Sequence, residues 1–167
     1  MYDKNQAHYV TVTGIAIKDG KYLIAKRAGF EKAFPNRWTV PGGKVKVLDY
    51  CLKKKDTGKL WYNVLEEGLN REFLEEVGFE VKNIGYVTSM VYLREDGIPS
   101  LIVSLYCEPK ENSEVKLCNA LTEYVWVDLE DAKNYDLIDG IYEELVILDK
   151  QLKTGEKIDG WKKGGID

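Results

Sequence analysis

The sequence predicts an α/β fold of the α+β type, in which a mixed β-sheet is sandwiched between helices. Strand-like segments precede and follow one amphipathic helix, and a second helix ends the pattern, so the elements run strands, helix, strands, helix. The 167 residues suit a single core. We therefore expect one domain over residues 1–167, with an inserted excursion at about 47–60 and a loose tail at 154–167.

The first third of the chain predicts a hairpin, a short strand and a glycine turn. Residues 8–18 alternate in polarity and are rich in β-branched side chains, and residues 22–25 continue as the return strand. The Asp-Gly pair at 19–20 between them is a two-residue hairpin signal. A short strand at 38–40 then leads into the Pro-Gly-Gly turn at 41–43.

A helix is predicted from about residue 63 to residue 77. Asn63 is a suitable N-cap, and Glu66 three residues later would complete a pair similar to a capping box. Gly78 is the expected C-terminal stop.

Strands and a last helix follow. Two longer strands are predicted at about 79–94 and 99–108, and an Asp-Gly pair at 96–97 joins them. A strand at 123–127 leads into a short helix, and the last helix is predicted at about 138–152.

Composition excludes several classes of protein. The net charge of −4 gives no basic field that would gather nucleic acid or an anionic membrane. No apolar run approaches the roughly 20 residues that a bilayer crossing needs, and no signal peptide is recognised at the N-terminus. Cys51, Cys107 and Cys118 form no CxxC pair, which fits a reducing compartment. We expect a cytoplasmic protein that binds neither membrane nor nucleic acid.

The helix at 63–77 carries carboxylates where a scaffold helix would carry leucines. On a helical wheel, Leu65, Leu69 and Phe73 form the apolar stripe that should face the sheet. Glu72 and Glu76 fall within about 40° of the centre of that stripe. Like charges at this spacing repel each other, and partial burial increases the cost. A solvated acidic face is the alternative, but its phase on the wheel would be different.

Something positive must offset these carboxylates. Arg71 is one candidate, and a divalent metal is the better one. Clustered carboxylates without histidine or paired cysteine suit a hard ion that prefers oxygen ligands. We therefore expect magnesium, with manganese as the other candidate.

The same segment resembles the Nudix hydrolase family. The back half of the family's box reads here Arg71-Glu72-Phe-Leu-Glu75-Glu76-Val-Gly-Phe79, a complete match over nine residues. The Pro-Gly-Gly turn upstream is also similar to the family, and the likeness extends over roughly residues 8–130. This resemblance implies a Nudix-like sheet between helices and hydrolysis of a phosphoanhydride in a nucleotide-like substrate.

The front of the box departs from the family pattern. Counting six positions forward from Gly43 reaches Asp49, whereas counting eight back from Arg71 reaches Asn63. The two positions differ by 63 − 49 = 14 residues, so an insertion splits the box. Neither position holds the expected glutamate. Three acidic residues are candidates to replace it, or the role is missing: Asp49, Asp56 and Glu66.

The resemblance also implies roles for individual residues. It implies a metal site formed by three side chains and one backbone carbonyl, namely Glu72, Glu75, Glu76 and the carbonyl of Gly42. Glu72 would activate the attacking water, and Glu76 and Glu123 are the other catalytic candidates. For Glu123 an ordinary strand charge is the alternative.

Two further residues are candidates for substrate binding. Arg27 is similar to the family's phosphate-binding arginine. Trp38 is the other, although it could instead pack beneath the metal loop.

Two hypotheses about function remain open at the level of sequence. The first is an active, magnesium-dependent pyrophosphohydrolase acting on a nucleoside triphosphate or another nucleoside diphosphate linked to a further moiety. The second is a catalytically weak or inactive module that keeps the fold and binds nucleotides. Turnover distinguishes them. A homodimer is left open, because nothing in the sequence addresses oligomeric state.

Overall fold

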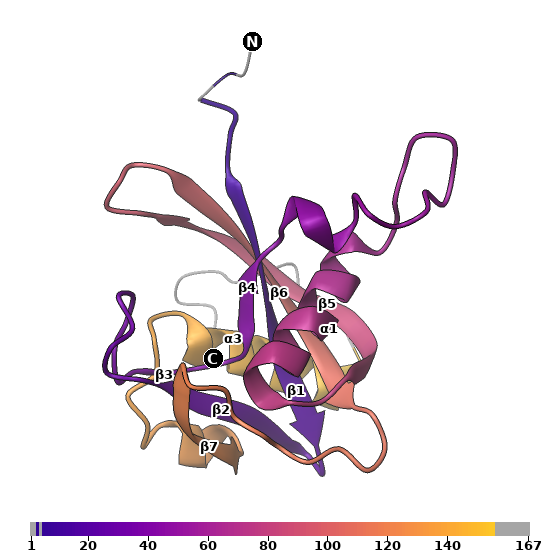
Figure 1. Cartoon of the computed structure of the whole chain (residues 1–167). Coiled ribbons are helices and arrows are strands. Elements are labelled where there is room, and N and C mark those ends of the chain that lie inside the picture. The colour runs from indigo at the N-terminus through magenta and orange to yellow at the C-terminus, as the bar shows by residue number, and fades with distance from the viewer. Residues whose placement is uncertain (1–2, 4, 156–167) are drawn as a thin grey trace.

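The computed structural model describes residue 3 and residues 5–155, and this part of the chain is a mixed sheet with helices on both faces (Figure 1). The predicted fold class is confirmed. The strands are β1 (Tyr9–Lys18), β2 (Lys21–Arg27), β3 (Trp38–Thr39), β4 (Gly42–Lys44), β5 (Val81–Leu93), β6 (Pro99–Pro109) and β7 (Leu121–Val127). The helices are α1 (Val64–Val77), α2 (Leu129–Ala132) and α3 (Ile141–Thr154), with a 3-10 turn η1 (Val47–Asp49).

The central strand β1 belongs to both halves of the sheet. Its first part pairs in parallel with β6 and antiparallel with β4, and its end forms a hairpin with β2. The strand order is β3-β2-β1-β6-β5, with β4 added on β1 and β7 added on β2. This arrangement places β4 beside β1, directly opposite the helix that carries the glutamates.

Two hydrophobic clusters cover the two faces of the sheet. One includes Leu69, Phe73 and Val77 of α1, and the other includes Leu145 and Leu148 of α3. Figure 1 shows α1 in front of the sheet and α3 behind it. The apolar stripe predicted for α1 therefore does face the sheet. Glycine at position 14 allows this close packing, because a Cβ there would lie 2.7 Å from the side chains of Leu69 and Phe73.

The predicted cap is present in full at the C-terminal end of α1 and only in part at its N-terminal end. Gly78 is the C-cap in the left-handed conformation (φ 79°), and its N–H donates to the carbonyl of Phe73, as predicted. Asn63 is the N-cap residue, as predicted, but the expected cap by its side chain is absent. A capping side chain needs an extended backbone, whereas Asn63 is left-handed (φ 55°) and makes no side-chain cap. No capping pair with Glu66 forms.

The predicted strands are present with shifted ends, and one strand was missed. The glycine turn at 41–43 continues into β4, which pairs with β1 through Gly42 and Gly43. Two adjacent glycines carry no alternating pattern, so periodicity does not reveal this strand. The last helix begins at Ile141, three residues later than predicted. Of the tail predicted to be loose, residues 156–167 lie outside the described part of the chain.

The excursion predicted at about 47–60 projects from the body of the protein (Figure 1). After η1 it contains neither helix nor strand up to Asn63. Its two ends are held together by a ring contact between Tyr50 and Trp61, whose centroids are 5.5 Å apart. Leu52 within it is 82% exposed. In the described part of the chain, the helices lack the length and apolar character that a membrane crossing needs.

Candidate active site

The glutamates of α1 face the two glycines of β4. Glu72 is buried, with 7% of its surface exposed, although it is a carboxylate on the apolar side of the helix. Glu76 lies one turn later and is mostly covered, whereas the side chain of Glu75 is half exposed. The sequence pattern thus located two carboxylates in the space between helix and sheet.

Glu76 is held by the backbone of β4. Its Oε2 accepts a hydrogen bond from the N–H of Gly42 at 3.0 Å. Burial raises the pKa of Glu76 to about 7, and the charge of Glu72 adds to the rise. The Gly42 N–H and the charge of Arg27 act in the opposite direction. A carboxylate in this position favours a nearby cation.

Gly43 makes room for the carboxylate of Glu72. A Cβ at position 43 would lie 2.7 Å from Oε2 of Glu72, which is closer than real side-chain contacts allow. A Cβ at Gly42 would instead meet the backbone of β1, 2.7 Å from the Cα of Thr13. Gly42 is therefore required by close approach to the neighbouring strand, whereas a Cβ at Gly43 would displace the Glu72 carboxylate.

Arg71 joins the glutamates to the loop before the helix. Its Nη1 donates to Glu72 at 2.6 Å and to Glu75 at 3.0 Å. Its Nε donates to Oδ1 of Asp49 at 2.6 Å, and its Nη2 donates to Oδ2 of Asp49 at 3.2 Å and to the carbonyl of Lys44 at 3.1 Å. Despite partial burial, these acidic partners raise the pKa of Arg71 further above its usual value. Arg71 is a fixed cation that orients two of the three glutamates.

The three candidates for the missing box glutamate lie in different surroundings. Asp49 forms a two-bonded pair with Arg71, and its side chain is only 6% exposed. Asp56 accepts from the backbone N–H of Tyr62 at 2.9 Å, within the excursion. In the described part of the chain the side chain of Glu66 makes no hydrogen bond or ion pair. Only Asp49 reaches the glutamate cluster.

Arg27 stands at the end of β2, beside Glu76. Its Nε donates to the carbonyl of Ala33 and its Nη2 to Glu31, each at 2.8 Å. Its influence on the pKa of Glu76 places the two charges within electrostatic reach. Within residues 5–155, its Nη1 has no partner, so one end of the guanidinium is available to an anion.

Trp38 and Glu123 contact residues outside this cluster. Trp38 is only 9% exposed, and its ring packs edge-on against Tyr135 with centroids 4.8 Å apart. The carboxylate of Glu123 is paired with Lys26 on the neighbouring strand at 2.8 Å, and 56% of its side chain is exposed. Among the described residues, no hydrogen bond or ion pair links either of them to the glutamates.

The donor set has the chemistry of a hard divalent cation site. Glu76 lies against Gly42 and Glu72 lies against Gly43, both poorly solvated, and Arg71 links Glu75 to Glu72. As they stand, no three Asp, Glu, His or Cys side chains of the described residues converge closely enough to hold an ion. Arg71 holds Glu72 and Glu75, and Gly42 holds Glu76, each through one oxygen. Glu75 is exposed and can turn, so the residues present fit magnesium or manganese.

Four residues near the site were missed by sequence reasoning. Gly43 could have been found from the Pro-Gly-Gly turn, because a second glycine there signals close approach. Lys46 lies 3.9 Å from Glu75, and Glu31 fixes Arg27. Thr13 Oγ1 is the one buried side-chain polar atom without a partner among the described residues. Pairings across strands and loops leave no periodic signal for these three.

Comparisons with known proteins agree with this arrangement. A family model described as NUDIX domain matches residues 8–146. Nucleoside triphosphatase NudI of Klebsiella pneumoniae is 29% identical over 130 residues, which is 71% of this chain and 81% of that protein. NudI of Escherichia coli strain K12 is 30% identical with the same coverage. The solution structure of the E. coli ORF135 protein has a TM-score of 0.65 at 22% identity, covering 93% of this chain and 97% of that one.

Proposed function

Because the chain belongs to the NUDIX domain family, we propose that it hydrolyses a phosphoanhydride bond of a nucleoside triphosphate with the help of magnesium. The family model and the NudI relatives identify the chain as a Nudix pyrophosphohydrolase that acts on nucleotides. The triphosphate is favoured over other linked nucleoside diphosphates because the relatives are nucleoside triphosphatases. Manganese is the alternative ion.

The observation that carries the proposal is the placement of Glu72 and Glu76 against the glycines of β4, with Glu75 joined to Glu72 through Arg71. Glu72, Glu75 and Glu76 would hold the ion, with the carbonyl of Gly42 as a further ligand. When bound, the ion supplies charge neutralisation at the phosphates and lowers the pKa of a bound water. Glu72 accepts the proton of the attacking water, because Arg71 and Gly43 fix its carboxylate in place.

Arg27 binds the phosphates in this proposal. The carbonyl of Ala33 accepts from its Nε, and Glu31 accepts from its Nη2. These two bonds fix the guanidinium and leave Nη1 to meet a phosphate. A guanidinium that is positioned before the reaction stabilises charge on the attacked or leaving phosphate at little reorganisation cost.

Asp49 takes the place of the missing box glutamate by holding Arg71. This proposal rests on the two hydrogen bonds between them and on the burial of Asp49. It also weakens the case for an inactive binding module, whose only support was the missing glutamate. Trp38 and Glu123 stay candidates for substrate binding and catalysis, but their surroundings favour packing for Trp38 and a surface ion pair for Glu123.

The test is release of phosphate and pyrophosphate from a panel of nucleoside triphosphates, with and without magnesium. Glu76→Gln keeps an acceptor for the Gly42 N–H, so it should stay folded while turnover is abolished. Glu67→Gln is the matched control, because Glu67 lies on the same helix and pairs with Lys53 at the surface. Full activity of Glu76→Gln would refute the metal assignment. Tight nucleotide binding without turnover in the unchanged protein would favour the binding module.

A further inference from the structure

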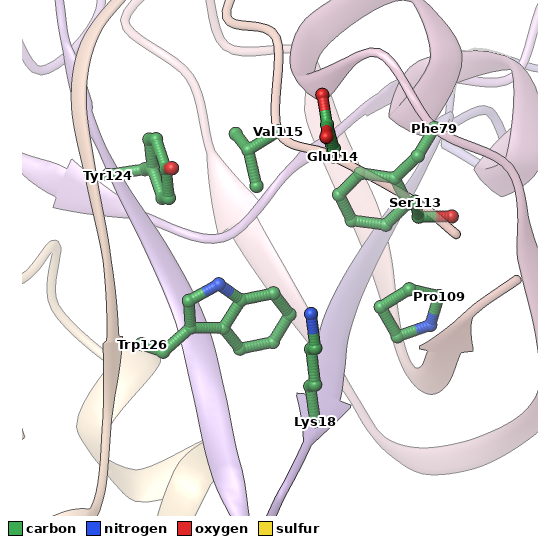
Figure 2. A pocket seen from close by; sticks show the side chains of 8 residues that line it. All are labelled: Lys18, Phe79, Pro109, Ser113, Glu114, Val115, Tyr124 and Trp126. Atoms are coloured by element: carbon green, nitrogen blue, oxygen red, sulfur yellow. The ribbon is translucent and has the colours of Figure 1, made fainter. Parts of the chain in front are cut away.

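A cavity of about 340 Å³ lies between the end of β1, strand β7 and the segment 110–120 that joins β6 to β7 (Figure 2). Its volume is within the usual range for small-molecule sites, roughly 300–1,000 Å³. None of the residues of the candidate active site lines it. It is lined by Lys18, Phe79, Pro109, Ser113, Glu114, Val115, Tyr124 and Trp126.

Aromatic rings stand on two sides of the cavity. Tyr124 and Trp126 come from β7, and Phe79 faces them from the segment after α1 (Figure 2). Phe79 packs on Phe73 of the core, with ring centroids 5.5 Å apart, so its position is fixed from behind. In the described part of the chain, Tyr124 and Trp126 make no ring contact of their own. A flat ring can therefore stack on Tyr124 or Trp126, whereas Phe79, only 4% exposed, forms part of the cavity wall.

The cavity also holds two charges without partners. Neighbouring lysines are neutralised, Lys82 by Glu111 at 3.6 Å and Lys110 by Glu80 at 2.9 Å. The side chain of Lys18 has no ion pair or hydrogen bond among the described residues, and its ammonium points between Trp126 and Pro109 (Figure 2). Glu114 likewise has no partner within residues 5–155, and it stands away from Lys18 across the cavity (Figure 2).

We propose that this cavity is a second ligand site, which binds a nucleoside monophosphate whose base carries an exocyclic amine. Lys18 would receive the phosphate, because an unpaired ammonium is a phosphate partner. The aromatic side chains would stack on the base, and the Glu114 carboxylate would accept from the amine. The ligand class follows from the lining and does not depend on the reaction at the glutamates.

The segment 110–120 connects this cavity to the candidate active site. Beyond the cavity, the N–H of Lys116 donates to the carbonyl of Val77 at 2.8 Å, and the N–H of Cys118 donates to that of Glu76 at 2.9 Å. The carbonyl of Ala120 accepts from Ala28, next to Arg27, at 2.8 Å. A ligand that orders residues 113–115 therefore restrains the backbone that carries Glu76 and Arg27. The effect on Glu76 and Arg27 rests on the proposed function, whereas ligand binding in the cavity does not.

The test measures binding of cytidine monophosphate (CMP) by tryptophan fluorescence in buffer with a chelator. We expect saturable quenching that is lost in Trp126→Phe. Lys18→Ala should bind at least about tenfold more weakly, the effect of one charge-assisted hydrogen bond. Lys21→Ala is the matched control, since Lys21 is an exposed lysine of the same hairpin and does not line the cavity. Arg27→Ala should bind CMP as the unchanged protein does.

Uridine monophosphate (UMP), whose base lacks the amine, should bind more weakly than CMP, and Glu114→Ala should remove this preference. Three results would overturn the proposal: no saturable quenching, equal loss in the two lysine variants, or loss in Arg27→Ala with none in Lys18→Ala. The last result would mean that CMP binds only at the glutamate site. Because binding is read without turnover, a negative result here leaves the proposed hydrolysis untouched.

Discussion

The substitution Asp49→Asn separates a positioning role from a merely structural one. Asp49 accepts from Nε of Arg71 at 2.6 Å and from Nη2 at 3.2 Å, and its side chain is 6% exposed. Asparagine keeps one acceptor, loses the charge, and turns an NH₂ group toward the guanidinium. Arg71 is then less firmly held, and with it the carboxylates of Glu72 and Glu75.

The expected loss can be sized from the burial of the pair. Removing one partner of a fully buried pair costs about 3–5 kcal/mol. The side chain of Arg71 is 23% exposed, so we expect a loss below this range, about 2–3 kcal/mol of unfolding free energy. Residues that orient metal ligands typically contribute 10–100-fold to metal affinity or activity. We expect Asp49→Asn to raise the half-saturating magnesium concentration or lower kcat by about that factor.

The pH dependence of the stability difference has a definite sign. Burial alone would raise the pKa of Asp49, but hydrogen bonds from Arg71 and from the Lys46 N–H outweigh it and hold the pKa below its usual value. The stabilisation by Asp49 is therefore complete at neutral pH and is lost as the pH falls through the acid range. The difference in unfolding free energy between the unchanged protein and Asp49→Asn should shrink accordingly.

The assay is a magnesium titration of turnover, with denaturant unfolding in parallel. Asp56→Asn and Glu66→Gln are the controls, because neither side chain reaches Arg71. If Asp49→Asn loses stability but keeps its magnesium dependence and kcat, Asp49 does not position the glutamates. If Asp56→Asn shows the larger kinetic loss, the role of the box glutamate belongs elsewhere.

Three further outcomes are expected. Gly43→Ala should lower kcat about 100-fold by displacing the Glu72 carboxylate. Gly58→Ala should not, because the space around Gly58 is open. Equal kcat values for the two variants would remove the close-approach argument. Arg27→Ala should lower kcat/KM about 100-fold, and steady-state kinetics that match the unchanged protein would remove its phosphate role. Burial raises the pKa of Glu144 to about 7. The unfolding free energy should therefore fall as the pH rises from about 4.5 to 7, by at most about 3 kcal/mol. Urea unfolding of Glu144→Gln should lack this dependence on pH.

The sequence could predict the parts of the site that lie on one helix, because the helical period fixes which face carries each side chain. The positions of Glu72 and Glu76 follow from the phase of the helix relative to Leu69 and Phe73, and the structure has them where the wheel placed them. The side-chain cap expected at Asn63 is absent because this residue is left-handed, a conformation that asparagine tolerates and that periodicity does not reveal.

Contacts between distant segments could be predicted only where the number of residues from a recognised motif pointed to a position. Asp49 was one of three candidates because of its spacing from Gly43, but its choice of Arg71 as a partner depends on how the loop folds back. The pairing of Glu123 with Lys26 depends on the register of β7 on β2. Strand register is a tertiary property, so a glutamate beside a tryptophan-containing strand gives no sign of its partner.

The excursion, which runs from Asp49 to Asn63, is a segment whose number of residues can change without disturbing the rest of the fold. Asp49 is tied to Arg71 before the excursion begins, and the carbonyl of Asn63 accepts from Glu67 after it ends. Within it, the N–H of Asp56 and that of Thr57 both donate to the carbonyl of Leu60. Doubling a loop costs only about 0.6 kcal/mol of closure entropy. Foreign peptides grafted at its tip should therefore leave α1 in register, which makes the excursion a natural position for evolutionary elaboration and for engineered sensors.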